Sequence, residues 1–248
     1  MERSIIVTGA SRGIGRSIAL KAAEKGYQVC VNYKGAREKA EAVVREIEAA
    51  GGTAIAVQAD MAVEADILRM FETVDRALAP LAALVNNAGI VDKAAPVADM
   101  TLDRLTRMFT TNITGPFLCA REAVRRMSTA HGGAGGGIVN ISSVAAKLGS
   151  PNEYVDYAAS KAAIDTMTIG LSKEVANEGI RVNAVRPGVI YTEIHASGGE
   201  PDRVERVKSM VPMQRGGEAE EIADAALWLL SDEASYVTGA LLDVTGGR

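Results

Sequence analysis

The sequence predicts an α/β fold in which helices cover both faces of one parallel, doubly wound sheet of about seven strands. Short apolar runs of strand length alternate with longer stretches of helical periodicity along the whole chain. A glycine-rich turn joins the first run to a helical stretch, and no repeat, low-complexity tract or linker divides the 248 residues. Such alternation is typical of a parallel sheet, and residues 1–248 are predicted to form a single domain.

Composition and charge narrow the class of protein. Hydrophobic residues make up 48% of the chain, enough for a sizeable core, and a net charge of -4 gives no basic field for nucleic acid or an anionic membrane. Residues 1–3 lead directly into a strand-length run, so a cytoplasmic protein is expected. Cys30 and Cys119 are interpreted as buried free thiols. His131 and His195 lack metal-ligand spacing, and no metal site is predicted.

The first predicted strand, residues 4–8, runs into the sequence TGASRGIG at 8–15 and then into an alanine-rich helix that ends near Gly26. Glycines allow a backbone to approach a phosphate closely, and a helix N-terminus presents free N–H groups to an anion. The pyrophosphate of a dinucleotide fits such a turn. Glycine turns also form for steric reasons alone, so this turn by itself leaves both interpretations open.

The next predicted elements are a strand, a charged helix and a strand, over residues 27–33, 36–50 and 53–58. In dinucleotide-binding folds an acidic residue about 20 positions past the glycines takes the ribose hydroxyls of NAD, whereas a basic group accommodates the extra phosphate of NADP. Asn32 stands at this place, and Arg12 and Lys34 supply positive charge nearby. The sequence therefore predicts NADP(H) in preference to NAD(H).

An amphipathic helix over 63–77 precedes a strand that runs from residue 81 into Asn86-Asn87-Ala88-Gly89. Such turn-forming residues are ordinary at the end of a strand, which is also where open α/β sheets bind ligands. A long helical pattern follows over 101–130, and Pro116 is expected to bend or interrupt it. Asn112 stands there among apolar residues, so its amide needs hydrogen-bond partners if it is buried.

A glycine-rich connection at 131–137 leads into the fifth predicted strand, 138–143, and the next helix carries the sequence YAASK at 157–161. Residues i and i+4 share a helix face, so the Tyr157 phenol and the Lys161 ammonium are predicted to project from the same side. A nearby cation favours a phenolate and moves its pKa toward the range of a general acid or base. The pair alone also fits an amphipathic helix with a solvated lysine.

The last third of the chain contains the sixth predicted strand, 180–188, which is broken by Pro187-Gly188. Residues 191–217 include glycines, a proline and a short helical stretch, and this segment is interpreted as a mobile lid. A helix over 218–230, with Trp228 on its core face, precedes a final strand over 240–244.

Several motifs occur in one order over most of the chain: TGASRGIG, NNAG, Asn112, the serine after the fifth strand, YAASK and PGVIYT. Together they resemble the short-chain dehydrogenase/reductase family. The resemblance implies a Rossmann fold, with the glycine turn on the pyrophosphate, Asp60 near the adenine and residues 87–89 on the adenosine side. It also implies that four residues hold the nicotinamide end: Pro187, Gly188, Ile190 and Thr192. The cofactor-binding residues so implied are Gly9, Ser11, Arg12, Gly13, Ile14, Gly15, Asn32, Tyr33, Lys34, Asp60, Met61, Asn87, Ala88, Gly89, Tyr157, Lys161, Pro187, Gly188, Ile190 and Thr192.

The same resemblance implies four catalytic residues. Ser143 would hydrogen-bond the substrate carbonyl, and Tyr157 would donate its proton as hydride arrives. Lys161 would bind the nicotinamide ribose and favour the phenolate, while Asn112 would hold a water that links Lys161 to solvent. Hydride reaching a carbonyl carbon creates an alkoxide, which has to be stabilised and protonated where it forms.

Neighbouring residues offer two alternatives to this assignment. Ser142 competes with Ser143 because adjacent strand residues face opposite ways, and the family pattern favours Ser143. Tyr154 competes with Tyr157, but residue 158 is an alanine rather than a lysine, which favours Tyr157. The segment 145–156 between serine and tyrosine is slightly longer than in many relatives.

The resemblance extends to both 3-oxoacyl-carrier-protein reductases and sugar or polyol dehydrogenases, and the sequence does not separate them. A carrier protein calls for a basic patch near the mouth of the site; Arg121, Arg125 and Arg126 are candidates, or form a solvated helix face. A small-molecule carbonyl or alcohol is the expected substrate. A catalytically idle dinucleotide-binding regulator is the alternative from another class. Family members are commonly homotetramers, so a homotetramer is expected.

Overall fold

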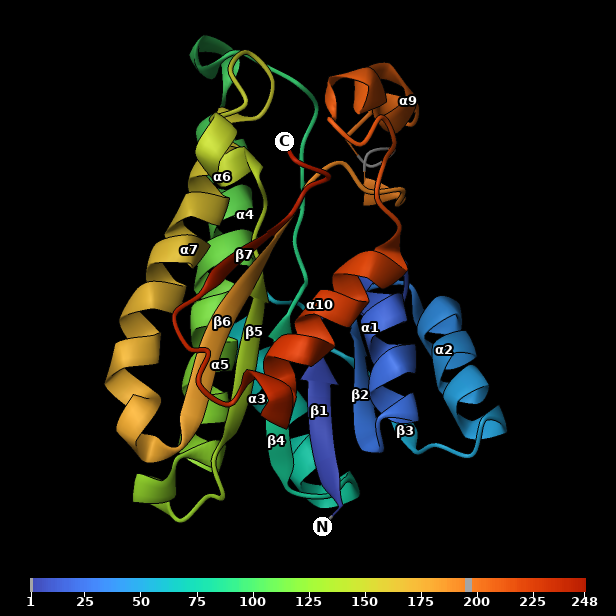
Figure 1. Cartoon of the computed structure of the whole chain (residues 1–248), viewed down its shortest axis with the longest axis vertical. Helices are drawn as coiled ribbons and strands as arrows, with labels where there is room; N and C mark the ends of the chain where they lie inside the picture. The colour runs from blue at the N-terminus through green and yellow to red at the C-terminus, as the bar shows by residue number, and fades with distance from the viewer. Residues whose placement is uncertain (1, 195–197) are drawn as a thin grey trace.

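The computed structural model describes residues 2–194 and 198–248. Within them seven parallel strands form one sheet in the order β3-β2-β1-β4-β5-β6-β7 (Figure 1), which confirms the predicted fold. The strand order reverses between β1 and β4, so the carboxyl ends of these two strands flank the place where such sheets bind ligands. The strands are β1 (Arg3–Val7), β2 (Tyr27–Tyr33), β3 (Ala54–Gln58), β4 (Leu81–Asn86), β5 (Gly136–Ile141), β6 (Ile180–Pro187) and β7 (Leu241–Val244).

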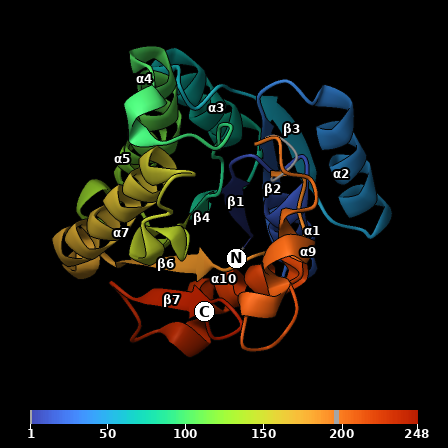
Figure 2. The ribbon, with the colours of Figure 1, turned by 90° about the horizontal axis from the view of Figure 1, so that it is seen from above.

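Helices cover the two faces of the sheet because successive strand residues point to opposite sides. In β1, Ile5 and Val7 enter one core and Ile6 enters the other. Figure 2 shows α1, α2 and α10 on one face, and α3, α4, α5 and α7 on the other. The longer helices are α1 (Gly13–Glu24), α2 (Arg37–Ala49), α3 (Glu64–Ala77), α4 (Leu102–Phe109), α5 (Gly115–Met127), α7 (Val155–Val175) and α10 (Ala219–Leu230), and the short ones are α6 (Ala145–Leu148) and α9 (Arg203–Val207).

A π-helical turn, Thr110–Thr114, joins α4 to α5. The interruption predicted at Pro116 therefore lies just before this residue, which occupies the first turn of α5, where its missing N–H is not needed. Asn112 lies inside the π turn and is 1% exposed. Such turns are frequent at functional sites because they re-aim side chains within a helix.

Two details of the predicted fold are wrong. Trp228 was predicted on the core face of its helix but is 40% exposed. The buried face of α10 is formed by other residues: Ala219, Ile222, Ala223, Ala226, Leu227, Leu229 and Leu230. Strand β5 begins at Gly136 rather than at residue 138. A Cβ on Gly136 would stand 2.4 Å from the Ala82 carbonyl oxygen, so glycine serves close strand packing there rather than a loop.

Both cysteines are buried free thiols, as predicted, and burial raises the pKa of Cys119 to about 12. In the described part of the chain, no helix is both long enough and apolar enough to cross a bilayer. The same residues contain no cluster of three or more His, Cys, Asp or Glu side chains able to hold a metal ion. His195 lies outside the described residues.

Candidate active site

Two adjoining cavities open at the carboxyl edge of the sheet, on either side of the point where the strand order reverses. One is lined by the glycine turn and the end of β2, the other by residues after β5, by α7 and by the end of β6. They share Ile14, Asn87, Gly89, Thr192 and Ile194, so they form one continuous cleft. We call its two parts the nucleotide half and the reactive half.

The nucleotide half is built on three glycines whose small size is required. Gly9 and Gly13 adopt φ values of +64° and +53°, a left-handed conformation that side chains disfavour. A Cβ on Gly15 would stand 2.5 Å from both the Asn87 Nδ2 atom and the Gly9 carbonyl oxygen. Helix α1 begins here at Gly13 without a side-chain cap, so its first N–H groups remain available to an anion. This cradle fits a pyrophosphate.

Hydrogen bonds fasten the NNAG turn to the glycine turn. The Thr8 hydroxyl accepts from the backbone N–H groups of Asn87 at 2.9 Å and Ala88 at 3.0 Å. In return, the Asn87 side chain donates to the carbonyls of Thr8 and Gly9, at 2.8 and 3.2 Å. The ends of β1 and β4 are therefore fixed against each other, with Gly89 between the two halves of the cleft.

Asn32 is 1% exposed and acts mainly as a brace. Its Oδ1 atom accepts from the Gly9 backbone N–H at 3.0 Å, while Nδ2 donates to the carbonyls of Val57 and Ala59 at 3.2 and 3.1 Å. Although Asn32 lines the nucleotide half, its amide is committed to backbone groups. Its structural effect is to hold the glycine turn against β2 and β3.

Charged groups stand at the rim of the nucleotide half. Lys34 is exposed and pairs with Asp60 at 2.8 Å, and the Asp60 carboxylate also accepts from the Ala62 backbone N–H at 3.0 Å. Arg12 is exposed at the start of α1. The remaining predicted residues of this half, Ser11, Tyr33 and Met61, also line it.

Tyr157 and Lys161 lie one turn apart on α7, and both line the reactive half. The Lys161 ammonium stands 5.6 Å from the centroid of the Tyr157 ring and donates to the Ile141 carbonyl at 2.7 Å. Burial lowers the pKa of Lys161 to about 8, and the Asp165 carboxylate opposes this shift. The sequence thus brings a phenol and an ammonium together on one helix face.

The predicted lowering of the Tyr157 pKa is contradicted. The Tyr157 side chain is only partly exposed along the cleft, and burial around its hydroxyl raises its pKa. A hydrogen bond with Ser143 acts in the opposite direction but is the smaller influence. Desolvation of the phenolate therefore dominates, and the phenol keeps its proton at neutral pH.

The two serines after β5 differ in what their hydroxyls bind. Ser142 is 2% exposed and donates to the Lys161 carbonyl at 3.1 Å, which ties β5 to α7. Ser143 is partly exposed in the reactive half, where its hydroxyl interacts with Tyr157 and accepts from the Ala145 backbone N–H at 3.1 Å. Geometry therefore favours Ser143 over Ser142 as the serine available to a ligand.

Asn112 connects the π turn to both the NNAG segment and α7. Its Oδ1 atom accepts from the Ile90 backbone N–H at 2.8 Å, and its Nδ2 atom donates to the Ile90 carbonyl at 2.9 Å and to the Ser160 hydroxyl at 3.2 Å. The Asn112 Oδ1 and Lys161 Nζ atoms each lie 3.5 Å from where a Gly89 Cβ would stand. Asn112 is thus close to Lys161 behind Gly89, although it lines neither half of the cleft and its own amide is largely engaged by backbone.

The far wall of the cleft follows β6 and continues into the predicted lid. Pro187, Gly188, Ile190 and Thr192 all line the reactive half. A Cβ on Gly188 would stand 2.8 Å from the Thr245 Cα atom, which explains the glycine. Of the segment 191–217, residues 195–197 lie outside the described part, and the rest includes α9, whose Arg203 lines the reactive half.

Ion pairs fasten α9 to the segment before α7. Arg203 contacts Glu153 at 2.6 Å and Glu200 at 2.8 Å, and its guanidinium lies 4.9 Å from the centroid of the Tyr154 ring. Arg206 contacts Glu200 at 2.5 Å. Tyr154, the alternative to Tyr157 as the catalytic tyrosine, is thus covered by the Arg203 guanidinium and is 5% exposed.

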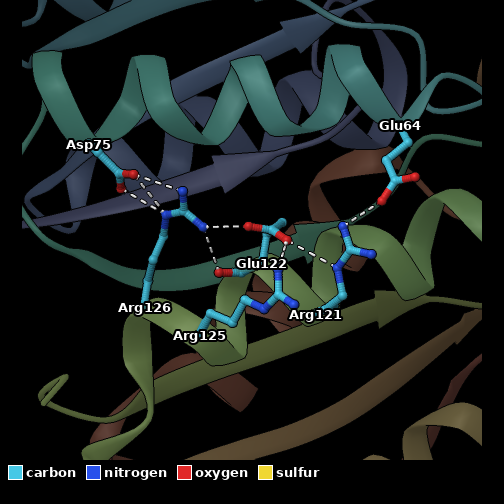
Figure 3. A network of polar contacts seen from close by, with 6 residues as sticks. All are labelled: Glu64, Asp75, Arg121, Glu122, Arg125 and Arg126. Carbon is cyan, nitrogen blue, oxygen red and sulfur yellow. Dashed lines mark hydrogen bonds and ion pairs between the residues drawn. The ribbon is translucent and has the colours of Figure 1, made fainter. Parts of the chain in front are cut away.

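The three arginines that the sequence offered as a basic patch do not lie at the cleft. Arg121, Arg125 and Arg126 converge on the buried carboxylate of Glu122, at 2.9 to 3.0 Å (Figure 3). Two carboxylates of α3 complete the network: Glu64 pairs with Arg121 and Asp75 with Arg126, both at 2.8 Å. None of the three arginines lines either half of the cleft. The three arginines are balanced by three carboxylates, and the pairs with Glu64 and Asp75 bind α5 to α3.

Sequence reasoning missed several residues of the reactive half. Leu148, Arg203 and Arg248 line it, although they come from α6, from α9 and from beyond β7. The backbone carbonyl of Ile141 that holds Lys161 was missed as well. A backbone acceptor leaves no signal in residue type, and the three side chains stand in no recognisable motif. Only the folded arrangement brings them to the cleft.

Known proteins are similar to this chain over nearly its whole length. The model of the family described as enoyl-(acyl carrier protein) reductase matches residues 9–248. An uncharacterised oxidoreductase of Escherichia coli strain K12, YgfF, is 60% identical over 243 residues, 98% of each chain. The 3-oxoacyl-[acyl-carrier-protein] reductase FabG of Staphylococcus aureus strain Mu50 is 40% identical over 247 residues, 100% of this chain and 98% of that protein.

Solved structures agree with the sequence comparisons. A dehydrogenase/reductase from Sinorhizobium meliloti 1021 superposes with a TM-score of 0.91 at 35% identity, covering 99% of this chain and 94% of that one. A short chain dehydrogenase from Burkholderia cenocepacia J2315, in complex with NADP, gives 0.90 at 33% identity, covering 99% and 97%. The fold and these relatives define an oxidoreductase that acts on CH–OH or C=O groups. The chain belongs to the short-chain dehydrogenase/reductase family.

Proposed function

We propose that this oxidoreductase transfers hydride between NADP(H) and a small carbonyl compound or secondary alcohol, with Tyr157 as the general acid and base. The observation that carries the proposal is the meeting of Tyr157, Lys161 and Ser143 in the reactive half, beside a cradle that fits a pyrophosphate. Following NADPH absorbance with a panel of carbonyl compounds tests it. Binding of NADPH without turnover of any compound would favour a catalytically idle regulator instead.

Two side chains act on the substrate carbonyl. Tyr157 donates its proton to the carbonyl oxygen, and Ser143 hydrogen-bonds the same oxygen. The raised pKa of Tyr157 supports this role in the reducing direction, because the phenol holds its proton near neutral pH. When bound, the nicotinamide supplies or takes up the hydride.

The other assigned residues bind and orient. Lys161 gives one N–H to the Ile141 carbonyl and has two more for the ribose hydroxyls. Asn112 holds a water that links Lys161 to solvent. The glycine turn with the first N–H groups of α1 binds the pyrophosphate. The nicotinamide end is bound by Pro187, Gly188, Ile190 and Thr192. The segment 191–217 closes as a lid. A cytoplasmic location is also proposed; cell fractionation tests it.

We expect NADPH to be preferred over NADH because of Arg12 and Lys34. Two of the similar structures were solved with NADP or NADPH, and here no carboxylate ends β2, whereas both cations line the nucleotide half. In the Lys34–Asp60 pair the lysine side chain is 73% exposed, so the pair is weak enough for a phosphate to compete with it. Replacing Arg12→Gln removes a charge-assisted contact and is expected to lower kcat/KM for NADPH about 10- to 100-fold while leaving NADH nearly unchanged.

Arg16→Gln is the matched control for this measurement. Arg16 follows Arg12 by one helical turn but is held in an ion pair with Glu46 at 2.6 Å and does not line the nucleotide half. Replacing Arg16 should change kcat/KM for NADPH and for NADH by the same factor. Activity with NADH equal to or above that with NADPH in the wild type would contradict the preference.

A small free substrate is favoured over a carrier-bound one. Relatives include carrier-protein reductases, but the arginines that would have received an acidic carrier are balanced by carboxylates away from the cleft. A comparison of free and carrier-bound 3-oxoacyl thioesters as substrates checks this. Much higher kcat/KM for the carrier-bound form would contradict it.

A homotetramer is proposed, in which α5 and α7 pack against symmetry mates. Phe117 on α5 and Ile169 on α7 support it, because these large apolar side chains are 50% and 39% exposed. Multi-angle light scattering is expected to give about four times the 26.0 kDa chain mass. Changing Phe117→Asp should shift the mass toward a smaller species, and a wild-type monomer at working concentration would contradict the assembly.

A further inference from the structure

Asp165 stands one helical turn beyond Lys161 on α7 and has no part in the roles assigned above. Four residues separate Tyr157 from Lys161 and Lys161 from Asp165, so the three side chains follow one face of the helix. Asp165 is 6% exposed. Its Oδ2 atom accepts two hydrogen bonds from Arg186, at 3.0 and 2.8 Å, while its buried Oδ1 atom has no hydrogen-bond partner.

Charges of alternating sign continue outward from this pair. Arg186 lies on β6, and its Nη1 atom is 3.5 Å from the Asp243 carboxylate on β7. Asp243 in turn pairs with Lys147 of α6, which is half exposed. The resulting row, Lys161, Asp165, Arg186, Asp243 and Lys147, runs from the bottom of the cleft to the surface. Beyond Lys161, the side chains of Asp165 and Arg186 are shielded from solvent, at 9% and 12% exposed, whereas Asp243 and Lys147 are more exposed.

The groups around Lys161 come from four elements. On α7 they are Tyr157 and Asp165; β5 gives the Ile141 carbonyl, which accepts from the ammonium. The π turn gives the neutral amide of Asn112. From β6, Arg186 is held at the far side of the Asp165 carboxylate. Among these groups Asp165 is the carboxylate; it forms no ion pair with Lys161 and acts on the ammonium through space from one helical turn away.

We propose that Asp165 is a positioning residue that keeps Lys161 charged inside the cleft, and that Arg186 sets how much of the Asp165 charge reaches Lys161. This inference rests on the proposed function, in which the Lys161 ammonium binds the ribose. A buried ammonium without a counter-charge loses its proton readily, whereas a carboxylate one turn away stabilises it. A carboxylate shared with an arginine stabilises it less.

The sign of the effect follows from the balance at Lys161. Burial lowers its pKa to about 8, and Asp165 acts to raise it. Removing the carboxylate leaves burial unopposed, so Lys161 should lose its proton at a lower pH. Removing Arg186 takes away the cation that shares the Asp165 carboxylate, so Lys161 should keep its proton to a higher pH. The two replacements are expected to act in opposite directions.

The test is a titration of Lys161 in the full chain labelled with ¹³Cε-lysine, followed by NMR. The Lys161 resonance is assigned as the one missing from Lys161→Arg. Asp165→Asn, which keeps the shape of the side chain, should lower the titration midpoint by about one pH unit or more. Arg186→Gln should raise it. Asp243→Asn makes the same chemical change farther along the row, on a residue that is 34% exposed, and should leave the midpoint in place.

The pH profile of kcat/KM gives a second readout, in which the alkaline limb should move with the titration midpoint in each variant. If Asp165→Asn does not fold, Arg186→Gln decides, and an unmoved midpoint there overturns the inference. An unmoved Asp165→Asn midpoint in an enzyme that reduces carbonyls also overturns it and leaves the proposed function standing. A shifted midpoint in a protein that turns over no carbonyl supports the Asp165–Lys161 coupling and overturns the proposed function alone.

Discussion

Tyr157→Phe is expected to lower kcat by about 10²- to 10⁴-fold, the range for loss of a positioned general acid. Phenylalanine keeps the ring that lies 5.6 Å from the Lys161 ammonium and removes only the hydroxyl. Hydride transfer would then leave an alkoxide with no proton donor in place. The measurement is steady-state reduction of the best carbonyl substrate from the panel, with NADPH affinity followed separately by fluorescence titration. Affinity should change little.

Tyr236→Phe makes the same chemical change where it cannot affect the cleft. Tyr236 is fully exposed, and it lines neither half. Its variant should match the wild type in both measurements. Turnover by Tyr157→Phe within tenfold of the wild type would remove Tyr157 as the acid, and Tyr154 and Ser143 would have to be tested next.

Asp156→Ala should cost about 3–5 kcal/mol of the free energy of unfolding, the range for breaking a buried ion pair. Asp156 is 2% and Arg104 9% exposed, and two hydrogen bonds of 2.7 and 3.1 Å join them. Arg104 also donates to the Lys93 carbonyl at 2.7 Å. The pair thus fastens α4 and the segment after the NNAG turn to the start of α7, next to Tyr157. Alanine would leave the guanidinium buried without its carboxylate.

Differential scanning fluorimetry and urea unfolding measure this loss. For a chain of this size, about 2–4 °C per kcal/mol gives a fall in Tm of about 6–20 °C. Asp92→Ala is the matched control, because Asp92 pairs with Arg107 on the same helix but both partners are more exposed, at 27% and 57%. It should cost about 1 kcal/mol or less. Equal losses in the two variants would contradict the special role of the buried pair.

Local sequence was sufficient for the parts of the site that depend on spacing along one element. The glycines at 9, 13 and 15 predict a turn whose backbone can approach a ligand closely. The structure shows the neighbouring atoms that a side chain at these positions would crowd. Tyr157 and Lys161 share a helix face because four residues separate them. The continuous apolar run of β1 likewise supplies both cores, because successive strand side chains such as Ile5 and Ile6 point to opposite faces.

Sequence failed where the outcome depends on partners far away in the chain. Arg121 and Arg126 look like a basic face, yet their charges are balanced by Glu64 and Asp75, 57 and 51 residues away. The acidity of Tyr157 follows from burial, which the YAASK spacing does not reveal. Trp228 was placed in the core by its hydrophobicity, but smaller apolar residues already fill the buried face of α10.

The π turn at Thr110–Thr114 places one more residue between α4 and α5 than an ordinary helical turn holds. Each residue of an α-helix advances the chain by about 100°, whereas the wider i→i+5 turn advances it by less per residue. Deleting one position would therefore let the segment wind as ordinary helix with little change in the angle between α4 and α5. Inside the turn the side chains would change direction, and the amide of Asn112 would turn away from Ile90. The extra residue thus serves to aim Asn112 at Ile90 and Ser160.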